Sequence, residues 1–312
     1  MFLANHQNAL LDALLIATHC KRKPYFLTRS DVFKTALLKV FFGFLQMIPV
    51  YRIRDGKNSL AGNTAIFERC AQLLGRGEAV LIFPEGNHSL KRRVRPLSKG
   101  FTRILFLALE SNPSMDIGIV PIGVNYANAA KFPDKAALYY GKEIRVQDFF
   151  DKKDVSGSAS RLKEEVYHHL KKLTTHIEEE SSYEEIVHTL DRAKVDYLDP
   201  AGVNRIKEEG TSPEYRKIGK GKVALVKYIL RGAFFILNFP MIIIWSIFIK
   251  PKVSEPEFLS TTRFMYALLF YPFFYLLFIA GMLEFLNWPA TSIICLAHLT
   301  LNIVLVKLSW ED

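Results

Sequence analysis

The chain has 312 residues, half of them hydrophobic, and carries 41 lysines and arginines against 31 acidic residues, a formal net charge of +10. This length allows one large domain or two ordinary ones, and the excess of apolar residues after Gly221 predicts a soluble part followed by a membrane part. A basic chain suits nucleic acid, anionic lipid headgroups or phosphorylated substrates, and the membrane segments favour the last two over nucleic acid.

Cysteines and the N-terminus give two further expectations. Cys20, Cys70 and Cys295 lie far apart without the paired spacing of metal ligands, so we expect reduced cysteines and no metal site. The first four residues run straight into polar sequence, without the basic start and apolar stretch of a signal peptide. We therefore expect the N-terminal part to stay in the cytoplasm.

Residues 1 to about 148 alternate between short apolar runs and helical patterns. The expected strands are 2–4, 24–28, 47–52, 79–83, 117–124 and 137–146. The expected helices are 9–18, 31–45, 59–74 and 99–111, with Asn8 and Asp31 as caps. This alternation predicts an α/β fold in which a largely parallel central sheet is flanked by helices. Because ligands bind beyond the carboxyl ends of such strands, His6, Arg52 and Glu85, which each follow an expected strand, predict one shared site.

The remaining sequence predicts two further parts. Residues 151–222 read as a charged helical extension with a helix over 161–180, a second from Tyr183 to Leu190 and beyond, and a basic linker from Gly210. We expect its histidines, among them His176, to lie on these helices. Residues 223–312 are rich in apolar residues and predict a hydrophobic membrane region. The chain is thus divided into 1–150, 151–222 and 223–312.

Three uncharged stretches are each near the roughly 20 residues of a spanning helix: 232–249, 264–283 and 285–306. Basic residues flank the first stretch on both sides, so three spans would place one basic cluster outside, against the preference of positive charge for the cytoplasmic face. Pro240 permits a break in that stretch. We therefore favour a re-entrant or in-plane first segment followed by a spanning hairpin, with three spans as the alternative, and expect His298 to be hydrogen-bonded within the bundle.

His6 and Asp12 are the first candidates for catalysis. His6 is expected in the loop after a strand, and Asp12 about one turn into the next helix, which can bring the carboxylate back towards the imidazole. An imidazole oriented by a carboxylate can take a proton from a hydroxyl and pass it to a leaving group. An unrelated surface histidine and helix aspartate is the alternative interpretation of this pair alone.

A second polar stretch, Phe83-Pro84-Glu85-Gly86, follows the expected buried strand and precedes a basic run. The cations that follow it closely are Lys91, Arg92, Arg93, Arg95 and Lys99. Lys99 opens a helix, and a helix N-terminus is a natural phosphate site. Arg52 and Arg54 form a second basic point, and arginine matches phosphate with a bidentate fork. A solvated loop is the alternative for part of the run.

Four ordered blocks in residues 1 to about 148 resemble the glycerolipid acyltransferases, the family of 1-acylglycerol-3-phosphate acyltransferases. The matching residues are Asn5, His6 and Asp12 in the first block, Gly43 and Ile48 to Arg52 in the second, Phe83 to Gly86 with Ser89, Lys99 and Gly100 in the third, and Val120-Pro121-Ile122 in the fourth.

The resemblance implies roles for these residues. His6 is the expected general base and Asp12 its partner, Glu85 and Gly86 are expected to shape the acceptor pocket, and Arg52 is expected to hold the acceptor's phosphate, with Lys99 a further substrate-binding residue. An acceptor hydroxyl attacks an acyl thioester, and the tetrahedral intermediate needs donors for its oxyanion. Neither a metal nor an organic cofactor is implied; acyl-CoA or acyl-ACP is a co-substrate.

Three features differ from the family's usual pattern. Five residues rather than four separate His6 from Asp12, so the helix start must absorb one more residue. Asn87-His88-Ser89 replaces threonine–arginine–serine, so Lys91 or Arg92 would have to compensate for that arginine. Only five residues precede His6, where most members have a helical membrane-binding segment; a late start, a truncation, or anchoring by the C-terminal region would each account for this.

These observations predict an enzyme bound to the cytoplasmic face of the cell membrane. The resemblance implies that this enzyme would transfer a fatty acyl group from an acyl thioester to the hydroxyl of lysophosphatidic acid in phospholipid biosynthesis. Its expected partners are membrane lipids, the acyl donor and a phosphorylated glycerolipid acceptor, and not nucleic acid. Glycerol 3-phosphate or an aminolipid is the alternative acceptor, and a truncated, catalytically weak lipid-binding membrane protein is the alternative class.

Overall fold

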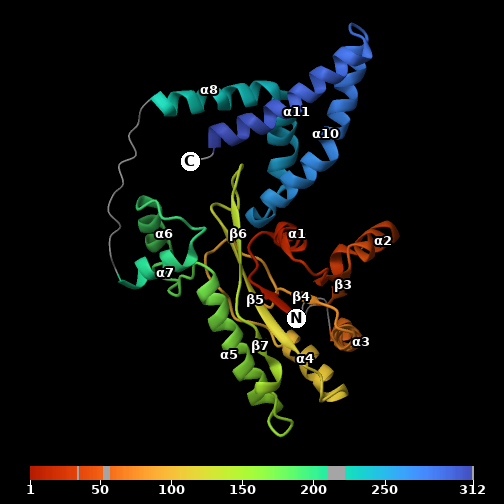
Figure 1. Cartoon of the computed structure of the whole chain (residues 1–312), viewed down its shortest axis with the longest axis vertical. Coiled ribbons are helices and arrows are strands. Elements are labelled where there is room, and N and C mark those ends of the chain that lie inside the picture. The colour runs from red at the N-terminus through yellow and green to blue at the C-terminus, as the bar shows by residue number, and fades with distance from the viewer. Residues whose placement is uncertain (34, 52–56, 210–221, 311–312) are drawn as a thin grey trace. The chain divides into compact units, whose positions relative to one another are not determined.

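A computed structural model describes residues 1–33, 35–51, 57–209 and 222–310 (Figure 1). The chain divides into two compact units. The sheet unit comprises Met1–Ala127 and Lys135–Pro213, and the apolar unit comprises Asn128–Asp134 and Glu214–Asp312. The sheet unit therefore holds both the expected α/β part and the charged helical extension, and the division into three domains stays a prediction.

The sheet unit is built on strands in the order β3-β2-β4-β1-β5-β6, with β7 paired to β5. The strands are β1 (Phe2–Ala4), β2 (Tyr25–Arg29), β3 (Met47–Val50), β4 (Val80–Ile82), β5 (Gly118–Tyr126), β6 (Ala136–Tyr140) and β7 (Ile144–Arg145). Strands β1 to β5 pair in parallel, whereas β6 and β7 run antiparallel to β5. The expected largely parallel α/β sheet is thus confirmed, and the single last strand expected over 137–146 is two short strands.

Seven helices belong to the described part of the sheet unit. They are α1 (Ala9–His19), α2 (Ala36–Phe44), α3 (Lys57–Gly75), α4 (Gly100–Ser111), α5 (Val155–Leu173), α6 (Tyr183–Arg192) and α7 (Pro200–Glu209). Figure 1 shows α4 and α5 alongside the central strands. The expectation of one helix over 31–45 was wrong at its start, because Ser30–Val32 forms a separate 3-10 turn before α2.

The core lies between the parallel strands and these helices. Leu3 and Val80 on neighbouring strands are fully buried, as expected for strands covered on both faces. Helix α4 buries Phe101, Ile104 and Leu105, and α5 buries Leu162, Val166 and Leu170 at helical spacing. Burying each such side chain contributes roughly 1.5–3 kcal/mol. This packing fixes the strand ends that carry the candidate site.

Helix α5 ends earlier than expected. The sequence predicted a helix to residue 180, but Thr174 has extended backbone angles (φ −132°, ψ 153°) and the chain leaves the helix there. The apolar spacing of α5 continues to Ile177, which is fully buried but packs with α6 and α7 residues in a second cluster. The start also differs, since Asp154 caps α5 by accepting from Gly157 N–H at 2.8 Å.

The apolar unit consists of helices α8 (Lys222–Leu237), α9 (Phe239–Ile244), α10 (Leu259–Leu283) and α11 (Trp288–Trp310). A π-helical turn, Trp245–Ile249, continues α9. Segments Pro256–Leu283 and Trp288–Trp310 are long and apolar enough to cross a membrane. Segments Leu225–Leu237 and Phe239–Lys252 meet at an angle of 82°, next to Pro240. This break lies within 232–249, the uncharged stretch in which Pro240 allowed a break to be expected.

Candidate active site

His6 follows the central strand β1, which lies between β4 and β5. The backbone pairing of β1 with β5 reaches Ala4, and the side chain of Asn5 then continues it. Asn5 Oδ1 accepts from Val124 N–H at 2.7 Å, and its Nδ2 donates to Val124 O at 3.0 Å. The buried amide therefore fixes the backbone just before His6 against β5.

Asp12 lies in the first turn of α1 and points back at His6. His6 Nδ1 is 2.7 Å from Asp12 Oδ2, which also accepts from the backbone N–H groups of Gln7 at 2.7 Å and Asn8 at 2.8 Å. The hydroxyl of Tyr126 donates to Oδ1 at 2.6 Å. The carboxylate is fully buried and surrounded by donors, which is the environment of an ionised, acceptor-only group.

These contacts set the tautomer of His6. Because Asp12 accepts, Nδ1 carries the proton and Nε2 carries the lone pair. The imidazole stacks on the ring of Phe83 with centroids 4.1 Å apart, and the ring of His88 meets it edge-on at 5.5 Å. The His6 side chain stays 15% exposed, and Nε2 has no hydrogen-bond partner among the described residues. The lone pair of His6 Nε2 is thus accessible at the surface of the site.

The additional residue between His6 and Asp12 is absorbed where α1 begins. Ala9 has φ +37°, in the left-handed region that costs a residue with a side chain roughly 1 kcal/mol. The turn is closed by Leu11 N–H, which donates to Asn8 O at 2.9 Å. The helix start therefore rotates so that Asp12 still reaches the imidazole.

The loop after β4 lies beside His6 because β4 and β1 are neighbouring parallel strands. Ser89 N–H donates to His6 O at 3.0 Å, and Ser98 N–H donates to Pro84 O at 2.7 Å. Gly86 has φ +73°, a conformation that glycine adopts without a side-chain clash. The loop is thus tied to the candidate base on one side and to the start of α4 on the other.

Glu85 in this loop is held by Arg95, a partner that sequence reasoning missed. The Glu85 side chain is only 2% exposed, and its Oε2 accepts from Arg95 Nη2 at 2.7 Å and Nε at 3.1 Å. Burial raises the pKa of Glu85, and the neighbouring Arg95 opposes that shift. The signal was present in the sequence, since a carboxylate that follows a buried strand needs a cation and the basic run offered one.

Arg92 and Lys91, expected to replace the missing arginine, have other partners. The Arg92 guanidinium donates to Tyr126 O at 2.9 Å and Ala127 O at 2.8 Å, and it lies 3.4 Å above the ring of Tyr197. Lys91 pairs with Glu180 at 3.4 Å. Arg92 therefore holds the end of β5. Arg95 is the cation next to the loop, and its side chain keeps 26% exposure.

The segment after α5 also binds the basic loop, the segment that carries Lys91, Arg92 and Arg95. Ile177 N–H donates to Arg92 O at 2.9 Å, and Arg92 N–H donates to the Tyr183 hydroxyl at 2.7 Å. These bonds join residues more than 80 positions apart in the chain. The extension is therefore part of the framework that positions Arg95.

His176 adds a further link and corrects an expectation. It lies on the extended segment after α5 rather than on a helix, and it is 3% exposed. Its Nδ1 accepts from Val94 N–H at 3.0 Å, and its Nε2 donates to Glu178 at 3.0 Å. Burial lowers the pKa of His176 to about 4, so the imidazole is neutral at neutral pH.

Of the other expected substrate-binding residues, the structure describes Lys99 but not Arg52. Lys99 precedes the first residue of α4 and is exposed. Arg52 and Arg54 lie outside the described residues, so their phosphate contacts stay a prediction. Strand β3, which ends at Val50, is separated from β1 by β2 and β4, about 14 Å at the usual strand spacing.

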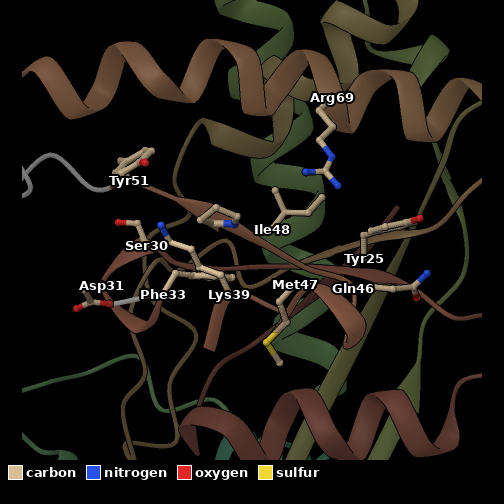
Figure 2. A pocket seen from close by; sticks show the side chains of 12 residues that line it. Tyr25, Ser30, Asp31, Phe33, Lys39, Gln46, Met47, Ile48, Tyr51 and Arg69 are labelled. Carbon is tan, nitrogen blue, oxygen red and sulfur yellow. The ribbon is translucent and has the colours of Figure 1, made fainter. Parts of the chain in front are cut away.

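A cavity of about 560 Å³ lies along β2 and β3 (Figure 2). Figure 2 shows the Arg69 side chain reaching towards it from helix α3. Gly43, Ile48 and Pro49, from the second of the four sequence blocks, line this cavity together with the cations Lys39 and Arg69. Within the described ranges, no three His, Cys, Asp or Glu side chains are grouped so that they could hold a metal ion.

Comparisons with known proteins agree with the four blocks. Residues 1–125 match the protein-family model described as Acyltransferase. The chain is 32% identical over 84 residues to glycerol-3-phosphate O-acyltransferase 2 of Saccharomyces cerevisiae and 26% identical over 83 residues to glycerol-3-phosphate O-acyltransferase 1. Each match covers 27% of this chain but only 11% of the yeast protein's length.

A solved structure is also similar to the chain. The 1-acyl-sn-glycerophosphate acyltransferase PlsC from Thermotoga maritima aligns with a TM-score of 0.38 at 16% identity. The alignment covers 57% of this chain and 67% of that chain.

Proposed function

Since residues 1–125 form a domain of the glycerolipid acyltransferase family, we propose that this chain transfers a fatty acyl group from an acyl thioester to the hydroxyl of lysophosphatidic acid. The observation that carries the proposal is the free Nε2 of His6, oriented by the buried Asp12 and placed beside the Glu85 loop. The donor is acyl-CoA or acyl-ACP, and no metal or organic cofactor takes part.

The reaction follows from this tautomer. His6 Nε2 accepts the proton of the acceptor hydroxyl while the oxygen attacks the thioester carbonyl carbon. Asp12 stabilises the imidazolium that forms, through the 2.7 Å contact with Nδ1. The tetrahedral intermediate then collapses, the carbon–sulfur bond breaks, and the thiolate takes the proton from His6. The products are the acylated acceptor and the free thiol carrier.

Arg95 is our candidate for the phosphate contact that the missing arginine makes in the family. Its Nε and Nη2 donate to Glu85, and Nη2 also donates to Asn87 O, while Nη1 makes no hydrogen bond within the described part of the chain. The two remaining N–H groups, both on Nη1, can donate charge-assisted hydrogen bonds to phosphate oxygens. Glu85 thus orients the cation, Lys99 at the start of α4 supplies a second positive charge, and Arg52 remains a third candidate.

Glycerol 3-phosphate is the second candidate acceptor. It is favoured by the similarity to the two yeast glycerol-3-phosphate acyltransferases. Both acceptors carry a phosphate and a free hydroxyl, so they use the same base and cations and differ only in the acyl chain that the site must accommodate.

Two helices, α10 and α11, are long and apolar enough to cross a membrane, which indicates a membrane protein. We propose that it resides in the cell membrane with the sheet unit in the cytoplasm. Basic residues flank the apolar region, and they support this orientation because positive charge prefers the cytoplasmic face of a membrane.

An acyl-transfer assay tests the function. The full chain, purified in detergent, is given radiolabelled acyl-CoA with lysophosphatidic acid, glycerol 3-phosphate or the phosphate-free monoacylglycerol. We expect phosphatidic acid from the first acceptor and little product from monoacylglycerol. A higher kcat/KM for glycerol 3-phosphate would make that acceptor the substrate. No transfer to either phosphorylated acceptor, with acyl-CoA or acyl-ACP, would overturn the proposal.

A further inference from the structure

The apolar unit contains a cluster of polar side chains at the break between α8 and α9. Asn238, 1% exposed, donates through Nδ2 to Asn302 Oδ1 at 2.6 Å and to Phe234 O at 2.9 Å. Its Oδ1 accepts from the hydroxyl of Tyr271 at 3.0 Å. Polar side chains are costly inside a bilayer unless such partners satisfy them. The cluster therefore joins the break to both helices of the hairpin.

His298 completes this polar cluster. Its Nε2 donates to Leu237 O at 3.2 Å, the last carbonyl of α8 before the break. Its Nδ1 accepts from the Tyr275 hydroxyl at 2.7 Å and lies 3.3 Å from Asn302 Nδ2. Broken backbone at membrane depth persists only where other groups satisfy its carbonyls. His298 supplies that donor, so α11 stabilises the break.

The break lies deep along the hairpin. Asn302 stands eight residues before Trp310 at the end of α11, about 12 Å along the helix axis. Tyr271 stands twelve residues after Leu259 at the start of α10, about 18 Å along its axis. In a hydrocarbon core about 30 Å thick, these distances place the break near the middle.

Helices α8 and α9, which meet at the break, both contact the open end of the α10–α11 hairpin. At this end α10 starts and α11 ends. On the α8 side, Arg231 donates to Ser309 O at 2.9 and 3.1 Å. On the α9 side, Met241 O accepts from the Tyr266 hydroxyl at 2.8 Å, and the Trp245 ring lies 5.5 Å from the Tyr266 ring. Contacts at one end of the hairpin thus hold both α8 and α9, the two segments that meet at the 82° bend.

Arginine and aromatic side chains mark that open end. The Arg231 guanidinium lies 5.1 Å from the ring of Trp310, and Arg263 lies 5.5 Å from the ring of Trp245. Tryptophan and arginine together are typical of the headgroup level of a membrane, and cationic side chains there attract anionic lipids. Exposed Trp288, at the start of α11, provides an aromatic anchor at the other end.

We propose that α8 and α9 form one re-entrant element that enters and leaves the bilayer on the same face, while α10 and α11 span it. The polar cluster of Asn238, His298 and Asn302 holds the turn of this element at mid-depth. Three straight spans would instead require α8 and α9 to be collinear. The proposal does not depend on the acyltransferase activity.

Single cysteines decide between the two topologies. The parent is the full chain with its three cysteines replaced, and the variants carry Ser254→Cys, Asp151→Cys or Glu284→Cys at exposed positions. A membrane-impermeant maleimide is added to sealed vesicles of either orientation. We expect Ser254→Cys and Asp151→Cys to label in the same vesicles and Glu284→Cys in the opposite ones. Labelling of Glu284→Cys together with Asp151→Cys, and of Ser254→Cys opposite to them, would overturn the re-entrant element.

A second experiment tests the polar cluster. Asn238→Leu in the Ser254→Cys chain removes the bonds to Asn302 and Tyr271 and makes a straight apolar span favourable. We expect the Ser254→Cys label to appear in vesicles of both orientations. Thr300→Val, an exposed position of α11, is the matched control and should leave the labelling one-sided. Unchanged one-sided labelling of the Asn238→Leu chain would overturn the role of the cluster.

Discussion

The two units each contain a histidine within a hydrogen-bond network, and the two networks differ in one respect. His6 uses only Nδ1, on Asp12, and keeps 15% of its side chain exposed. His298 uses both nitrogens, Nε2 on Leu237 O and Nδ1 on the Tyr275 hydroxyl. A histidine whose nitrogens are both satisfied by the fold holds structure together. A histidine that is oriented on one side and open on the other is available to a substrate.

The same contrast applies to the cations of the sheet unit. Arg92 donates to two carbonyls and stacks on Tyr197, so the fold occupies it, whereas Arg95 is fixed by Glu85 and keeps Nη1 open. Partial satisfaction thus separates groups that can bind substrate from those that build the framework. The predictions below test this distinction, beginning with the largest expected effect.

Asp12→Asn should lower kcat by about 10³- to 10⁴-fold, because an amide can present its N–H to Nδ1 and favour the wrong tautomer of His6. The measurement is kcat for acyl transfer in detergent. Tyr126→Phe is the control, since it removes only the donor to Oδ1 and leaves the imidazole contact, with a loss of about tenfold or less. An Asp12→Asn chain as active as Tyr126→Phe would show that the tautomer does not matter.

Arg95→Met should lower kcat/KM for a phosphorylated acceptor by about 100-fold, near 2.7 kcal/mol. It removes the open donors and leaves the buried Glu85 without its cation. Because burial raises the pKa of Glu85 and Arg95 opposes this, the variant should protonate Glu85 at higher pH and move the acid limb of the activity profile upward.

Arg93→Met is the control for Arg95, because Arg93 lies in the same loop as Arg95 but pairs with the exposed Glu180, which follows α5. We expect it to change kcat/KM by no more than about threefold. Equal losses in the two variants would mean that the loop needs positive charge in general rather than the Arg95–Glu85 pair.

His176 should make the fold sensitive to acid. Its pKa is lowered from 6.5 to about 4, so the unfolded chain binds the proton first and stability falls as pH drops from 6.5 to 4. The loss is about 3 kcal/mol across that window. His176→Gln should flatten this part of the curve, measured by urea unfolding of the full chain in detergent, whereas His188→Gln on the exposed face of α6 should not. An unchanged slope in His176→Gln would contradict the assignment.

Ala9→Gly should give the smallest effect, a stabilisation of about 1 kcal/mol, because glycine adopts φ +37° without strain. Ala13→Gly is the matched control, equally buried on the same helix but in ordinary helical geometry, and should lose about 1 kcal/mol. Thermal unfolding of the two variants gives the comparison. A loss at both positions would place the additional residue of the His6–Asp12 loop elsewhere.

Local patterns predicted what local physics decides. The alternation of apolar runs and helical periods gave the α/β sheet, and the strand ends gave His6 beside Glu85 because β1 and β4 are neighbours. The contact between His6 and Asp12 also followed, because it spans six residues and one helix start. The antiparallel direction of β6 did not follow, since short apolar runs carry no sign of strand direction.

Long-range partners decided the rest. The donor from Tyr126 to Asp12 bridges 114 positions, and the bond from Val94 to His176 bridges 82. The helix expected to 180 ended at Leu173 because residues after Thr174 find backbone and side-chain partners in the basic loop, which outweigh a continued helical period. Such pairings depend on topology rather than on spacing. For Glu85 the sequence offered a run of nearby cations, but it did not single out Arg95 among them.

The contrast between the two histidines is tested most directly by acyl transfer to lysophosphatidic acid with His6→Gln and His298→Gln, each purified in detergent. Glutamine can replace the two hydrogen bonds of His298 but cannot act as a base at position 6. We predict that His6→Gln loses about 10³-fold or more in kcat while His298→Gln stays within about threefold of the natural chain. Equal turnover of His6→Gln and the natural chain would contradict the assignment of His6 as the general base.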